Sequence, residues 1–95
     1  MNKREAYRDL AKAQIKEWEA KIDLLKARGE KATAGAKIDV INAVEKLQAE
    51  KNALQKKMAE MMDSGGDVWE KLKDGTEKAM DDMKKTVDKT MEKFK

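Results

Sequence analysis

The sequence contains no cysteine, no histidine and no proline. Without cysteine and histidine the chain has no disulfide, no thiolate nucleophile, no Cys/His zinc site and no imidazole for proton transfer at neutral pH. Because a proline inside a helix costs roughly 3 kcal/mol, a chain without proline can run long helices, and glycine must supply the breaks. We therefore expect a protein that is not an enzyme and that holds no metal and no cofactor.

Aromatic residues and long apolar runs are also scarce. The two tryptophans, one tyrosine and one phenylalanine are too few for a conventional globular core. No apolar run approaches the roughly 18 residues of a membrane-spanning helix. The polar N-terminus lacks the apolar segment of a signal peptide, so we expect a soluble, cytoplasmic chain.

Charged residues are abundant and both signs are mixed. They make up 43% of the chain, against 40% hydrophobic residues, and the net charge is +3. Residues 1–36 carry nine Lys/Arg against six Asp/Glu, whereas residues 67–95 carry eight of each. Interleaved charges of this kind are typical of solvated helix faces and long helices, so we do not expect a nucleic-acid partner.

A long amphipathic helix is predicted for residues 1–62. Asn2 followed by Glu5 predicts a capping box at its start. Beyond it, apolar residues recur in steps of three and four, which keeps one stripe of a helix facing a partner, with Lys51 as its main charged member. Because one helix cannot bury such a stripe alone, we predict a homo-oligomer or another protein partner packed on it. The predicted interface consists of Ile15, Trp18, Ile22, Leu25, Val40, Val44, Leu47, Leu54, Met58 and Met61.

Residues 29–36 are the weak point of this helix. Either residues 3–62 form one helix of about 60 residues, roughly 90 Å long, or the stretch from Gly29 to Gly35 is a turn. We prefer the continuous helix, because the stripe passes through Ala32 and Ala36 without losing a position. Gly29 and Gly35 would each destabilise a continuous helix by roughly 1 kcal/mol, so a helical hairpin is the alternative. That alternative is a three-helix bundle of residues 3–28, 36–62 and 67–94.

Residues 63–66 form a predicted hinge. Gly65 and Gly66 can supply the left-handed residue that closes a helix, and Asp67 can cap the next helix. If this hinge lets residues 67–95 fold back, we expect Trp69, Leu72 and Met83 to meet the stripe that carries Leu47, Leu54, Met58 and Met61.

The last helix, residues 67–95, contains an eleven-residue repeat. Residues 69–79 align without gaps with residues 80–90, and each apolar anchor is replaced by an apolar residue. Eleven residues in three turns keep an apolar stripe nearly straight, which suits a helix that lies along a surface. This face either packs on protein or lies at the headgroup level of a membrane. It consists of Trp69, Leu72, Met80, Met83, Val87 and Phe94.

Several segments resemble a known kind of protein. The opening seven residues, the block from Lys16 to Asp23, and residues 65–70 with the lysine-rich repeat after them resemble a family of short bacterial coiled-coil proteins described as stress-response proteins. The eleven-residue unit is similar to the repeats of late-embryogenesis-abundant group 3 proteins and lipid-droplet coat proteins. The resemblance implies an all-α coiled-coil architecture and carries no catalytic motif.

These features together predict an all-α fold with a long coiled-coil helix, a Gly-Gly hinge and a shorter amphipathic helix. The predicted function is that of a non-catalytic scaffold or stress-associated protein that acts through self-association and helix–helix interaction. The alternative is reversible binding of the last helix to a lipid surface.

Overall fold

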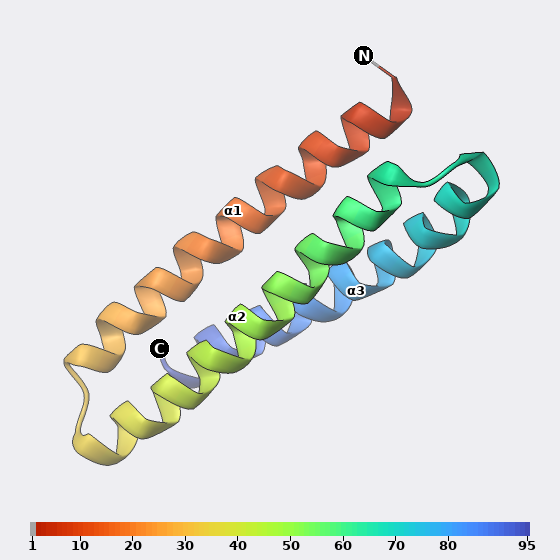
Figure 1. The fold of residues 1–95 in the computed structure, drawn as a ribbon. Coiled ribbons are helices and arrows are strands. Elements are labelled where there is room, and N and C mark those ends of the chain that lie inside the picture. The colour runs from red at the N-terminus through yellow and green to blue at the C-terminus, as the bar shows by residue number, and fades with distance from the viewer. Residues whose placement is uncertain (1) are drawn as a thin grey trace.

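Three helices make up the computed structural model, which describes residues 2–95. They are α1 (Lys3–Glu30), α2 (Ala34–Asp63) and α3 (Gly66–Lys93). Helix α2 runs antiparallel to both of the others, and α1 and α3 run in the same direction (Figure 1). The molecule measures 51 × 20 × 17 Å. The all-α class is confirmed, and the arrangement is the three-helix bundle.

The single helix preferred for residues 3–62 is divided in two. Helix α1 ends at Glu30 and α2 begins at Ala34, so residues 31–33 form a turn. Both glycines that were expected to break the helix lie inside helices, Gly29 in α1 and Gly35 in α2. By folding back, the apolar stripe of one chain covers itself, so its burial needs no second copy.

Gly29 is the residue that lets the two helices approach at this end. A Cβ atom added to Gly29 would lie 2.6 Å from Cγ1 of Val40. Any larger residue would therefore push α1 and α2 apart. The glycine is needed for helix packing, and the break in the chain lies two residues beyond it.

The expected hinge connects α2 to α3, but two of its predicted details are wrong. Within residues 2–95 no glycine has a positive φ, and Gly65 is extended, with φ −79° and ψ 172°. The end of α2 is closed by Ser64 instead, whose hydroxyl donates to the Met61 carbonyl at 2.7 Å. Helix α3 has Gly65 at its N-cap position, so Asp67 lies in the first turn and does not cap the helix.

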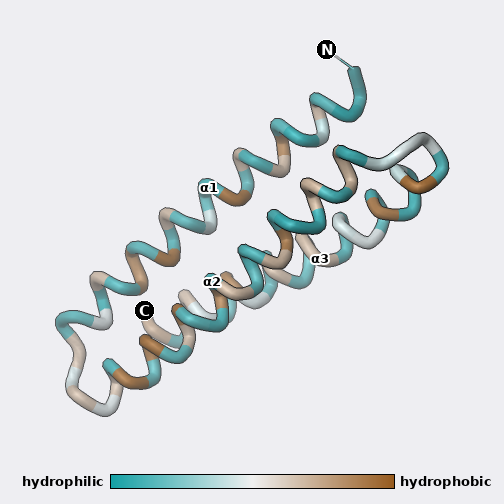
Figure 2. Tube along the Cα trace, viewed as in Figure 1, coloured by the Kyte–Doolittle hydropathy of each residue, from teal (hydrophilic) through white to brown (hydrophobic). Residues whose placement is uncertain are grey.

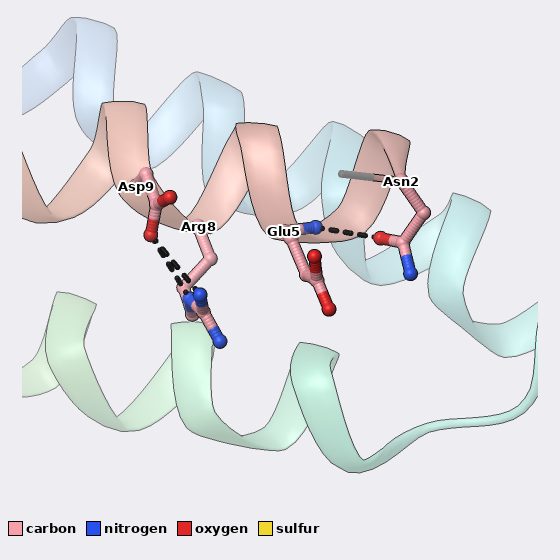
Figure 3. A network of polar contacts seen from close by, with 4 residues as sticks. All are labelled: Asn2, Glu5, Arg8 and Asp9. Carbon is pink, nitrogen blue, oxygen red and sulfur yellow. Dashed lines mark hydrogen bonds and ion pairs between the residues drawn. The ribbon is translucent and has the colours of Figure 1, made fainter.

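Asn2 caps the start of α1, which is one of the two bonds of the predicted capping box. The Asn2 side chain accepts a hydrogen bond from the Glu5 backbone N–H at 2.8 Å (Figure 3). One turn further along, the Arg8 guanidinium donates to the Asp9 carboxylate at 3.1 Å. Asn2 thus satisfies one of the N–H groups left free at a helix start.

One apolar core runs along the axis of the bundle, and all three helices contribute to it. Hydrophobic residues recur along each helix between hydrophilic stretches (Figure 2). Across residues 2–95, no helix is long and apolar enough to cross a membrane. The core consists of Ala11, Ile15, Trp18, Ile22, Leu25, Val40, Val44, Leu47, Leu54, Met58, Met61, Trp69, Met83 and Val87.

Candidate interaction surfaces

The ten residues predicted to form an interface between molecules are all buried inside one chain. Leu25 and Met61 have no exposed surface at all. The stripe pattern therefore identified buried positions correctly. In this structure the covering partner is the other half of the same hairpin together with α3.

The face of α3 assigned to lipid or to a partner packs on the same core. Trp69, Met83 and Val87 are buried, and the other three members, Leu72, Met80 and Phe94, are half-buried against the core. This agrees with the expectation that the face folds back towards the α2 stripe. In the closed bundle the face is covered, so an external partner can reach it only if α3 moves away.

An aromatic contact joins α1 to α3 at the end of the bundle where both helices begin. The rings of Tyr7 and Trp69 meet edge to face, with centroids 6.4 Å apart and planes at 76°. The Arg4 guanidinium and the Lys73 ammonium each lie 5.3 Å from the Trp69 ring centroid. Edge-to-face rings and cations over a ring face are both favourable arrangements.

Two polar atoms in this aromatic contact are buried without a hydrogen-bond partner: the Tyr7 hydroxyl and the Trp69 indole Nε1. Burial raises the pKa of Tyr7 to about 12, and the negative charges of Glu77, Asp74 and Asp81 add to the effect. An unpaired buried donor costs roughly 1–3 kcal/mol. The rings of the aromatic contact are therefore well packed, but two of its polar atoms lack hydrogen-bond partners.

An apolar groove lies between α1 and α2 beside the turn, and we call it the turn groove. Its volume is about 350 Å³. Ile41 is 55% exposed at its edge, and Ile38, three residues earlier on α2, is 61% exposed. The turn groove is lined by Lys26, Gly29, Glu30, Lys37, Val40, Ile41, Val44 and Glu45.

Two ion pairs between helices lie along the bundle. Lys51 and Glu19 join α2 to α1 at 3.5 Å, and Lys21 and Asp88 join α1 to α3 at 3.7 Å. The Lys51 side chain is 18% exposed and the other three are at least 36% exposed, and pairs near the surface contribute at most about 1 kcal/mol. Lys51, the charged member of the predicted stripe, thus keeps its amine beside the Glu19 carboxylate while its stem packs inward.

Residues 2–95 bring together no group of three acidic side chains that could hold a metal ion. The methionines with core spacing, Met58, Met61 and Met83, are buried among aliphatic and aromatic side chains. Their thioethers fill space between helices, which is the usual role of methionine in an adaptable core.

Sequence reasoning missed the residues that distinguish these surfaces. Tyr7 lies one step of four before Ala11, so the stripe could have been extended to it. Ile38 and Ile41 lie outside the stripe. Two isoleucines three residues apart on an otherwise polar helix face could have predicted an exposed apolar surface. The positions of Arg4 and Lys73 over Trp69 could not be predicted from the sequence, because they depend on how α1 and α3 pack.

No protein-family model, curated protein or solved structure matches this chain. What the protein does is therefore inferred from its own surfaces.

Proposed function

We propose that this chain is a non-catalytic protein that self-associates through helix–helix packing, with the turn groove as the interface. The supporting observation is the exposure of Ile38 and Ile41 beside an apolar groove. Contiguous exposed apolar surface on a small protein is typical of an interaction site. A scaffold role under stress, which the sequence resemblance implies, belongs to the same proposal.

The charges around the turn groove favour a second copy of the chain as its occupant. The rim carries Lys26 and Lys37 together with Glu30 and Glu45, so it has no net charge. Anionic lipid or nucleic acid would be attracted by a basic rim. A neutral rim with both signs suits the same rim on another copy, because each lysine can meet a glutamate across a two-fold axis.

The oligomeric state tests this proposal directly. We expect sedimentation equilibrium to show reversible dimers as the concentration rises from micromolar to millimolar. In folded protein that is concentrated without prior unfolding, Ile41→Glu should abolish these dimers, because a carboxylate would be buried in the interface. Leu10→Glu is the matched control, since Leu10 is 69% exposed on α1 and outside the turn groove. A wild-type monomer at all concentrations, or an Ile41→Glu variant that dimerises as fully as the wild type without having been unfolded and refolded, would reject the proposal.

A second candidate function is reversible lipid binding by α3, and the aromatic contact favours it. The Trp69 indole N–H and the Tyr7 hydroxyl have no partners in the closed bundle. If α3 left the bundle for a membrane surface, both groups would gain hydrogen-bond partners in the headgroup region. The same move would expose the α3 face to apolar lipid and keep its lysines in water.

Tryptophan fluorescence tests the lipid candidate. In a Trp18→Phe background the emission comes from Trp69, the other tryptophan of the chain. Trp69 is 7% exposed in the closed bundle, so moving its indole to the headgroup region, where the N–H gains hydrogen bonds, should shift its emission to the red. The shift should grow with vesicle concentration until it saturates. Vesicles of neutral and of anionic lipid should both be used, and an unchanged spectrum with both would exclude this function.

A further inference from the structure

We propose that the α1–α2 hairpin opens at Lys31–Thr33 and exchanges α1 with a second copy of the chain. In the exchanged dimer each copy contributes one continuous helix over residues 3–63, and α1 of each copy packs on α2 and α3 of the other. This exchange is a different association from packing through the turn groove. It is argued from the backbone of the turn, and its test is separate from the test of the turn groove.

The turn is close to helical already. Lys31 has φ −94° and ψ −3°, and its N–H and that of Ala32 bond to the Arg28 and Gly29 carbonyls, which continues α1 as a tighter turn. Thr33 has φ −65°, a helical value, and ψ 161°, an extended one. The extended ψ of Thr33 is thus a departure from helical geometry at the start of α2.

Little in the turn itself holds it in place. Thr33, at the N-cap position of α2, makes no side-chain capping bond, and the first turn of α2 has no acidic residue. The described turn contains no residue with positive φ that would specify a bend. A continuous helix would supply partners for the backbone groups that are free at the end of α1 and the start of α2.

The apolar stripe is symmetric about the turn, which is what an antiparallel pair of continuous helices requires. Leu25 and Val44 are equally distant in sequence from the midpoint between residues 34 and 35, and so are Ile15 and Leu54. Gly29 and Val40 obey the same relation and face each other in the hairpin. Two copies can therefore pair in the register that the hairpin uses within one chain.

Exchange keeps the contacts that hold the bundle together and makes them intermolecular. The Glu19–Lys51 and Lys21–Asp88 ion pairs and the Tyr7–Trp69 contact all join α1 to α2 or α3. Each would form between α1 of one copy and the other two helices of its partner. Only the geometry of residues 31–33 differs between the two forms, which is the requirement for domain swapping.

Ala34→Pro tests the exchange. Ala34 is the first residue of α2, where proline fits and its N–H is not needed, and the extended Thr33 before it suits a following proline. In a continuous helix the same proline would be internal, so we expect dimerisation to weaken by at least about a hundredfold. Gly66→Pro is the matched control, because it places proline at the first position of α3 after the extended Gly65. It should leave exchange unchanged.

The variants are compared in an Ile41→Glu background, which removes packing through the turn groove, after refolding at millimolar concentration. Because the chain has no cysteine, spin labels can be placed at Lys12→Cys and Lys56→Cys. The register in which Gly29 faces Val40 places residue 12 opposite residue 57, so the two labelled sites lie close together in the hairpin. On one continuous helix they would be about 66 Å apart. Labelled chains diluted in unlabelled protein should show the long distance in the dimer fraction. A short distance in that fraction, equal dimerisation of Ala34→Pro and Gly66→Pro, or no dimer at all would overturn the proposal.

Discussion

Gly29→Ala probes the contact that brings α1 and α2 together. The added Cβ would lie 2.6 Å from Cγ1 of Val40 and 3.1 Å from its Cβ. Rotating the valine side chain cannot relieve the second contact, because Cβ is fixed by the backbone. One helix must therefore shift at this end of the bundle.

The size of the effect follows from two opposing terms. Overpacking a well-packed site costs typically about 1–3 kcal/mol. Replacing glycine by alanine inside a helix returns about 1 kcal/mol. The difference is a net loss of up to about 2 kcal/mol in the free energy of unfolding. In the double variant with Val40→Ala the loss should be smaller than the sum of the single losses, because the clashing methyl group is gone.

Urea unfolding followed by circular dichroism measures these differences. Gly75→Ala is the control, since Gly75 lies inside α3 and a Cβ there meets nothing within 4 Å. It should gain about 1 kcal/mol. If Gly29→Ala gained stability equal to that of Gly75→Ala, the close approach of α1 and α2 at Gly29 would be refuted.

Three further changes give separate tests. Tyr7→Phe removes a hydroxyl without a partner and should raise stability by up to about 1 kcal/mol at neutral pH. Because the folded pKa of Tyr7 is raised from 10.0 to about 12, the wild type should lose stability as the pH rises through this range, and unfolding at successive pH values should show a smaller loss in the variant. Ser64→Ala removes the 2.7 Å bond to Met61 and should cost about 0.5–1.5 kcal/mol, whereas an unchanged urea midpoint would mean that water replaces the hydroxyl. Lys51→Leu should raise the melting temperature, because a leucine at this half-buried position gains apolar contact, while the ion pair with the 41% exposed Glu19 side chain contributes little.

The buried positions could be predicted because they follow from helix periodicity alone. Trp18, Leu25 and Leu47 recur at helical spacing, so they share one face whatever covers it. Trp69 and Met83 share a face of α3 for the same reason, and the two glycines after α2 allowed that face to fold back. Periodicity identifies the surface to be buried, and it does so independently of topology.

The surfaces between helices could not be predicted in the same way. The position of Arg4 over Trp69 depends on α1 and α3 beginning at the same end of the bundle. Within one chain, that alignment exists only if the chain turns at residues 31–33. Once the turn was missed, the aromatic contact and the turn groove were missed with it.

The position of the turn was hidden because the stripe fits both topologies. A hairpin and a continuous helix bury the same residues in the same register, so apolar burial favours neither. The hairpin closes the stripe within one chain and avoids the loss of translational and rotational freedom that a dimer requires. The continuous helix gains backbone hydrogen bonds in three turn residues, but it must recruit a second copy, so its share grows with protein concentration. The choice between the two forms therefore depends on residues 31–33 and on concentration, and a substitution such as Ala34→Pro can fix the topology without touching the core.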